Sequence, residues 1–203
     1  ELAKAGGPIE DVFALTPTQQ GMLFHSLAEP DSGVYVIQLL FELKDGFDEE
    51  VFQGAWESVV RRHLSLRADF AWDVYAKPVQ VVRREVEVTL RRVDWRGVSR
   101  EAQEQLLDEY LRRDREQGFD LRRAPLLRLA FFRRSDEEYN IVLSSHHLLL
   151  DGWSLSIVLQ EVLALYDAAR EGRTLRLKKP RSFKDYIDWL SQQDQSAAEV
   201  FWR

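Results

Sequence analysis

The feature that most constrains the fold is a pair of short apolar segments followed by a long amphipathic one. Residues 126–132 and 139–145 are apolar runs that predict two strands, and the polar turn at 134–137 predicts that they pair antiparallel. In residues 155–170 the apolar side chains recur at helical spacing. The sequence therefore predicts a β-hairpin followed by a helix that packs on it.

The rest of the chain mixes the same two kinds of element. A helix is expected from Thr16, because Thr is a good N-cap and Pro17 suits a first turn. Periodicity and turn residues predict further strands at 34–43, 66–72, 79–82 and 86–93, and further helices at 49–63, 99–115 and 182–192. This order indicates a mixed α and β fold.

Composition indicates a soluble globular chain. With 203 residues and 45% hydrophobic side chains it can bury the core of one domain, although two small domains are also compatible with this length. No apolar run approaches the roughly 20 residues that span a bilayer, and the N-terminus lacks the pattern of a signal peptide. We expect a cytoplasmic protein without a membrane partner. The absence of cysteine excludes disulfides, Cys-type zinc sites and thiol nucleophiles.

The charge distribution does not favour nucleic-acid binding. Arg-Arg pairs recur from Arg61-Arg62 to Arg133-Arg134, but acidic residues lie between them and the net charge is -6. A solvated charged surface is the expected arrangement. Local basic patches remain compatible with docking of an acidic protein or a phosphate group.

Residues 141–154 carry the best candidate for chemistry. They predict a strand that ends at His146-His147, then a short loop with Asp151-Gly152 and the start of a helix. Neighbouring residues on a strand point to opposite faces, so one histidine at most faces a cleft. A histidine accepts and returns a proton near neutral pH, which makes it a candidate general base. The pattern alone does not say which of the two it is.

The residues after the histidines are suited to hold the candidate base in place. Asp151 can hold the loop through an ion pair or a hydrogen bond, and Gly152 permits a sharp turn and close approach of a ligand. The following helix directs its free N–H groups toward the same place.

Three other interpretations compete with a catalytic base. The simplest is a buried, hydrogen-bonded His pair at a strand end. A metal site is disfavoured because neighbouring histidines on a strand do not readily reach one ion, so no metal is expected. A Ser-His-Asp hydrolase is disfavoured because the sequence has no Gly-x-Ser-x-Gly elbow.

The segment from His146 to Gly152 resembles the HHxxxDG signature of the chloramphenicol acetyltransferase-like superfamily. Residues 15–25, 62–70 and 183–189 resemble the first, second and fourth core motifs of condensation domains of nonribosomal peptide synthetases. The order and spacing also match, and the resemblance covers residues 8–203. It implies an α/β fold (an α+β sandwich) with a mixed, largely antiparallel sheet flanked by helices.

The resemblance further implies that residues 1–203 are the N-terminal lobe of such a domain, without its C-terminal lobe. The expected reaction is amide formation between thioesters carried on the phosphopantetheine arms of donor and acceptor carrier proteins. The implied partners are those carrier proteins, the second lobe and an adenylation domain of the parent. No cofactor is expected to bind the chain directly, and the isolated lobe is expected to be inactive.

The resemblance assigns a role to each site residue. His147 is expected to be the catalytic histidine, which deprotonates or orients the acceptor amine, and His146 to be structural. Asp151 is expected to pair with Arg62 or, second, with Arg67. Gly152 is expected to line the tunnel between the lobes. Two tryptophans, Trp189 and Trp202, are expected in the core or at the lobe interface.

Rival functions remain within and beyond this superfamily. A coenzyme A-dependent acetyltransferase carries the His-His segment near its end, whereas some fifty residues follow it here. An epimerization domain usually has Asp-Gly-Val-Ser-Trp after the histidines. A non-catalytic domain that recruits partners has to be excluded by assay. Residues 19–25 and 147–154 resemble the condensation subtype that accepts a D-configured donor.

Overall fold

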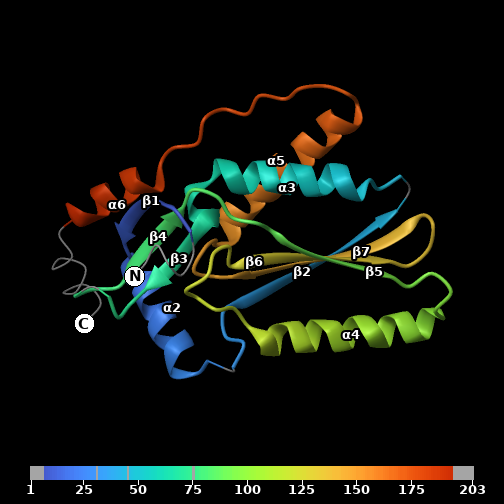
Figure 1. Cartoon of the computed structure of the whole chain (residues 1–203), viewed down its shortest axis with the longest axis horizontal. Coiled ribbons are helices and arrows are strands. Elements are labelled where there is room, and N and C mark those ends of the chain that lie inside the picture. The colour runs from blue at the N-terminus through green and yellow to red at the C-terminus, as the bar shows by residue number, and fades with distance from the viewer. Residues whose placement is uncertain (1–6, 31, 45, 75, 194–203) are drawn as a thin grey trace.

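A computed structural model describes residues 7–30, 32–44, 46–74 and 76–193. Its larger sheet has the strand order β2-β7-β6-β5 (Figure 1). These strands are β2 (Val36–Lys44), β7 (Glu138–His146), β6 (Leu127–Arg133) and β5 (Thr89–Asp94). β7 pairs antiparallel with both β2 and β6, which confirms the predicted hairpin, while β5 and β6 are parallel.

A second, smaller sheet has the order β1-β4-β3 and is antiparallel throughout. It contains β1 (Ile9–Ala14), β4 (Val79–Arg83) and β3 (Ala68–Ala71). The fold class is confirmed, but the strands divide between two sheets. The prediction omitted β1, whose side chains are mostly half-buried or exposed, so that its apolar pattern is weak.

The expected strand at 66–72 is wrong in its first part. Residues Leu64–Arg67 form a 3-10 helix, η1, directly after α3 (Glu49–Arg62). This tight turn places Leu66 and Arg67 in the interior, at 0% and 4% exposure, before β3 begins. The strand expected at 86–93 also begins later, at Thr89.

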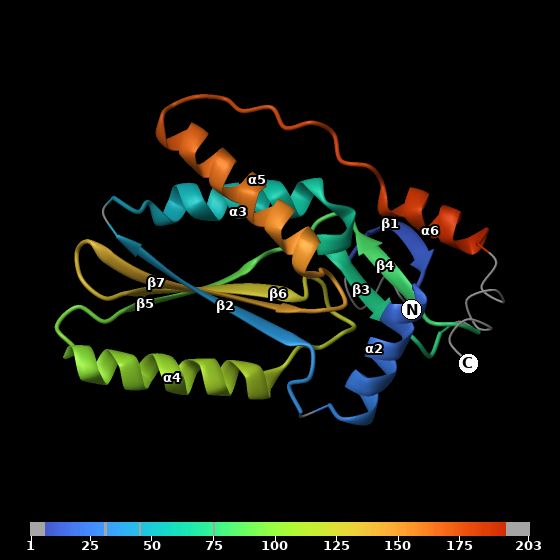
Figure 2. The ribbon, with the colours of Figure 1, turned by 180° about the vertical axis from the view of Figure 1, so that it is seen from behind.

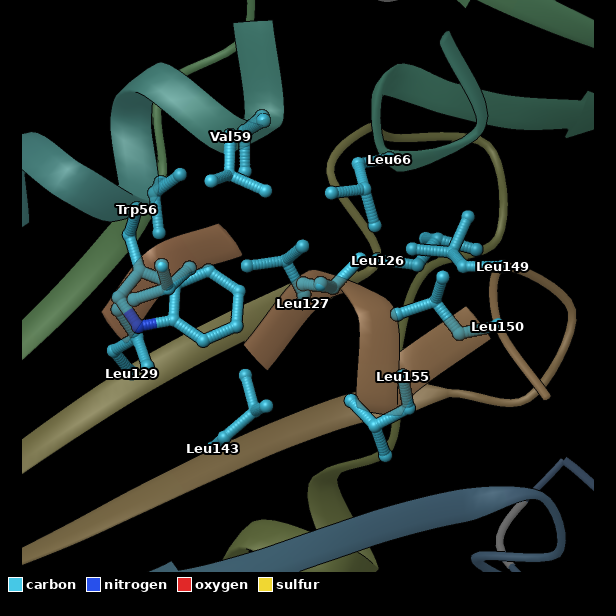
Figure 3. Close-up of a cluster of buried hydrophobic side chains, with 14 of the residues drawn as sticks. Trp56, Val59, Leu66, Leu126, Leu127, Leu129, Leu143, Leu149, Leu150 and Leu155 are labelled. Atoms are coloured by element: carbon cyan, nitrogen blue, oxygen red, sulfur yellow. The ribbon is translucent and has the colours of Figure 1, made fainter. Parts of the chain in front are cut away.

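Helices cover both faces of the larger sheet (Figures 1 and 2). On one face α3 packs beside α5 (Gly152–Arg170), and on the other lies α4 (Arg100–Gln117). Figure 3 shows side chains of α3, β6, β7 and α5 converging in the main core, among them Trp56, Leu129 and Leu143. A smaller cluster around Phe132 and Leu107 fills the space between α4 and the larger sheet. The fold therefore has three layers, and β7 runs through the middle one.

The remaining helices begin where their caps predict. α2 (Pro17–Ala28) has a capping box between Thr16 and Gln19, and α6 (Phe183–Ser191) is capped by Ser182. α6 lies beside β1, and its Trp189 is 54% exposed, so that residue is not in the core. Trp202 falls outside the described residues. Among the helices described, none is long and apolar enough to cross a membrane.

Candidate functional site

β7 brings both histidines to the end of the larger sheet. His146 is its last residue, and the main-chain N–H of His146 donates to the carbonyl of Leu126 (3.0 Å). His147 begins the turn toward α5, and its N–H donates to the carbonyl of Tyr35 (2.8 Å). Strand alternation turns the His146 ring inward to 3% exposure and leaves His147 half-buried.

The hydrogen bonds of His146 define its protonation. Its Nδ1 accepts from the N–H of Leu148 (3.2 Å), so the ring proton lies on Nε2, which is 3.3 Å from Ser26 Oγ. Ser26 Oγ in turn donates to the carbonyl of Met22 (2.8 Å). Burial, with a smaller contribution from His147, lowers the pKa of His146 to about 4. His146 is therefore neutral near pH 7, and it has no free lone pair with which to act as a base.

His147 holds the opposite tautomer. Its Nδ1 lies 2.6 Å from the carbonyl oxygen of Leu150. Because a carbonyl oxygen only accepts, Nδ1 carries the proton and Nε2 carries the lone pair. Within the described part of the chain, no group hydrogen-bonds to this Nε2. The geometry thus leaves His147 equipped to accept a proton.

The expected ion pair between Asp151 and Arg62 or Arg67 is wrong. Asp151 is exposed and caps α5: its Oδ1 accepts from the N–H (2.7 Å) and the Oγ (2.6 Å) of Ser154. The hydrogen bond from Ser154 Oγ makes the larger contribution and the bond from the Ser154 N–H a smaller one, and together they lower the pKa of Asp151. The physical reason is proximity, because the free donors of the first helical turn lie directly after it in the chain.

Both arginines have other partners. Arg62 Nε lies 3.0 Å from Glu161 Oε2 on α5, and the same oxygen is 2.7 Å from His63 Nε2. Arg67 Nη1 contacts Glu10 Oε2 (2.5 Å) and the carbonyl oxygens of Arg83 and Arg84. Arg62 therefore joins α3 to α5, and Arg67 joins η1 to the smaller sheet.

Gly152 is the first residue of α5, and it lacks the positive φ that would make glycine necessary for the turn. An added Cβ would meet no atom within 4 Å, so the space beside it is open. Its expected position in a tunnel stays a prediction. Among the described residues no three His, Asp or Glu side chains are grouped to hold a metal ion.

A buried polar cluster fastens α4 to the strand that carries the histidines. Asp114 on α4 lies 2.5 Å from Arg128 Nε, and it accepts from Ser144 Oγ (2.6 Å) and Gln38 Nε2 (2.6 Å). Burial alone raises the pKa of Asp114, but these bonds outweigh it, and the pKa lies below its ordinary value. The cluster anchors β7 two residues before His146.

Sequence reasoning missed several groups that hold the site. The carbonyls of Tyr35 and Leu150 act through the main chain, so residue identity gives no signal for them. Ser26, which contacts His146, and Glu161, which contacts Arg62, are signalled only weakly, since each is one of several polar residues in an amphipathic helix. Their partners become apparent only in three dimensions.

Comparison with known proteins gives consistent matches. The family model for the condensation domain matches residues 9–203. A linear gramicidin synthase polypeptide of Brevibacillus parabrevis is 47% identical over 194 residues, which are 96% of this chain and 4% of that protein. "Bacitracin synthase 1" of Bacillus licheniformis is 38% identical over 195 residues, again 96% of this chain and 4% of that protein.

The fold is also similar to solved structures. The starter condensation domain of rhizomide synthetase RzmA matches with a TM-score of 0.80 at 21% identity, over 90% of this chain and 45% of that one. The first condensation domain of the calcium-dependent antibiotic synthetase matches with a TM-score of 0.74 at 23% identity, over 83% and 40%. The chain thus spans less than half of these solved chains and a few per cent of the curated relatives.

Proposed function

Because the chain belongs to the condensation-domain family, we propose that it is the N-terminal lobe of a domain that forms amide bonds in nonribosomal peptide synthesis. Its substrates are an aminoacyl or peptidyl thioester as donor and an aminoacyl thioester as acceptor. The observation that carries this proposal is the state of His147, whose Nδ1–H is held by Leu150 and whose Nε2 is free to accept a proton.

His147 acts on the acceptor amine. As the amine nitrogen attacks the donor carbonyl carbon, a C–N bond forms and the C–S bond of the thioester breaks. Nε2 of His147 takes the proton that the nitrogen loses and passes it to the departing thiolate, so the imidazole ends neutral. The proton held on Nδ1 by the Leu150 carbonyl keeps Nε2 as the accepting atom.

The two thioesters arrive on phosphopantetheine arms of donor and acceptor carrier proteins, so the chain itself binds no cofactor. The parent also contains an adenylation domain and a second lobe. The share covered in the solved condensation domain, 45%, supports this half-domain assignment. The isolated lobe is inactive, because one wall of the site is absent. Segments 19–25 and 147–154 support the subtype with a D-configured donor and an L-configured acceptor.

Two rival functions are less well supported. A coenzyme A-dependent acetyltransferase is disfavoured because the family model and the relatives are those of peptide synthetases. A non-catalytic recruiting domain has the same fold but makes no use of a free Nε2 on His147.

The test is peptide formation by the parent condensation domain with both carrier proteins loaded. His147→Ala should lower the rate by about 10²- to 10⁴-fold, the usual contribution of a general base. His63→Ala is the matched control, since it removes a half-buried histidine that contacts Glu161 instead. A rate within about twofold of wild type for His147→Ala would favour the non-catalytic alternative.

A further inference from the structure

Tyr35 has an unusual main-chain conformation. Among the described residues it is the one non-glycine residue with a positive φ, 65°. It is the third residue of the turn 33–36, which is closed by a hydrogen bond from the Val36 N–H to the Gly33 carbonyl (3.1 Å). A positive φ at the third position after a negative φ at the second, here Val34, is typical of a type II turn, in which the third residue is usually glycine or asparagine. A tyrosine there is strained, and such strain persists only where the surroundings impose it.

The surroundings of the turn do impose this conformation. On one side, a Cβ on Gly33 would lie 2.8 Å from Arg115 Cγ and 3.0 Å from the Arg115 carbonyl, so the turn sits tightly against the end of α4. On the other side, Val36 is buried and enters the β2-β7 ladder opposite His146. The chain has only two residues, Val34 and Tyr35, with which to connect these two fixed points.

Tyr35 is hydrogen-bonded to His147, the candidate catalytic residue. The carbonyl oxygen of Tyr35 accepts from the N–H of His147 at 2.8 Å, one step beyond the last β2-β7 pair, Val36 and His146. The Tyr35 ring centroid lies 6.2 Å from that of His146, with the planes tilted by 59°. The main chain of Tyr35 thus contacts one histidine and its side chain lies near the other.

We propose that Tyr35 is a positioning residue for His147, and that it acts through its left-handed main-chain conformation. Two carbonyl groups then fix His147 at both ends: Tyr35 holds the main-chain N–H, and Leu150 holds the ring Nδ1–H. If φ of Tyr35 became negative, its carbonyl would turn away from His147. The main chain of His147 would lose this anchor, and its imidazole would no longer be held in place against the Leu150 carbonyl that enforces the Nδ1–H tautomer. The effect of Tyr35 on catalysis rests on the proposed function, whereas its effect on the position of His147 is independent of that function.

Substitutions at residue 35 separate the main chain from the ring. Tyr35→Gly removes the ring and adopts positive φ freely, whereas Tyr35→Val is β-branched and strongly disfavours positive φ. Tyr35→Phe keeps the ring and the strain, and it is the matched control. Each variant is made in the chain as it stands, labelled with ¹⁵N.

Two NMR measurements test the positioning role: hydrogen exchange of the His147 amide, and the ¹⁵N shifts of its imidazole. We expect the Phe and Gly variants to keep a protected amide and a single Nδ1–H tautomer. The Val variant should exchange at least about tenfold faster and show averaged nitrogen shifts, while its far-UV circular dichroism remains native. Unchanged exchange and tautomer in folded Tyr35→Val would overturn the proposal, as would a Gly variant that behaves like the Val variant. If Tyr35→Val does not fold, Tyr35→Ala, which also prefers negative φ, is judged by the same criteria.

An activity measurement in the parent domain links the geometry to catalysis. Tyr35→Val should lower kcat with little change in KM, and Tyr35→Gly should retain more activity than Tyr35→Val. Val34→Ala, in the same turn, is the control and should leave activity unchanged. An equal loss in the Gly and Val variants would contradict a main-chain role. If the proposed function itself is wrong, wild type forms no peptide either, and the NMR results still decide the positioning role.

Discussion

Nδ1 of His147 and the carbonyl oxygen of Leu150 are 2.6 Å apart, and this contact fixes the tautomer of the imidazole, as the carboxylate of a Ser-His-Asp triad fixes that of its histidine. Leu150 directly precedes Asp151, the N-cap of α5, so the start of the helix fixes the position of the carbonyl. Asp151 therefore supports the position of His147 indirectly, through the helix cap.

The cap predicts the effect of substitutions at Asp151. Asp151→Ala should destabilise the chain by about 1 kcal/mol, because the Ser154 N–H loses its acceptor. Asp151→Asn should cost clearly less, since asparagine caps almost as well. Chemical denaturation of both variants measures this difference. Equal losses in the two variants would mean that the negative charge of Asp151, and not its capping oxygen, is what stabilises the chain.

The arginine contacts predict which pairs of residues are energetically coupled. In double-mutant cycles Arg62 and Glu161 should couple by about 0.5 to 3 kcal/mol, since they are in contact and their side chains are 18% and 17% exposed. Arg62 and Asp151 should show additive effects. The exposed pair Arg112 and Glu116 on α4 is a control for surface charge, with an expected coupling of about 0.3 to 0.5 kcal/mol. Strong coupling of Asp151 to Arg62 would reinstate the ion pair that this geometry lacks.

These pairings explain why the sequence predicts the fold better than the site contacts. Hydrophobic periodicity and capping residues are local signals, and they were sufficient for β6, β7 and α5. The partner of a charged side chain depends on which elements pack together, and Arg62 on α3 meets Glu161 only because α3 and α5 lie side by side. Tyr35 shows the same limit, because a positive φ at tyrosine is imposed by the folded structure and leaves no pattern in the sequence.

Burial of His146 predicts a pH dependence of stability. In the folded chain its pKa is about 4 instead of the ordinary 6.5, so between these values the unfolded chain binds more protons. Stability from this group is complete above pH 6.5 and is lost as the pH falls toward 4. From pH 7 to pH 5 the loss should be about 2 kcal/mol.

The variant His146→Gln isolates this contribution. Glutamine stays neutral over the whole range, so the difference in unfolding free energy between pH 7 and pH 5 should shrink by about 2 kcal/mol relative to wild type. Urea denaturation at the two pH values gives both differences. An identical pH dependence for variant and wild type would show that His146 is accessible to protons in the folded chain.

The isolated chain should form no peptide. In the proposed tunnel the second lobe closes the site over His147, whereas in this chain His147 is only half-buried and Trp153, a few residues on, is 84% exposed. Without the opposite wall the two thioesters are not held in attack geometry, and the contribution of positioning to lowering the activation barrier, up to about 7 to 11 kcal/mol, is lost.

Exposed Phe24 and Ile157, at 68% and 55%, should also promote self-association. Mass spectrometry with loaded carrier proteins tests the first expectation, and light scattering over a concentration series tests the second. Adding the second lobe in trans is the positive control, and it should restore product for wild type but not for His147→Ala. Sustained turnover by this chain alone would contradict the half-domain assignment and favour an acyltransferase that completes its site between copies of the chain.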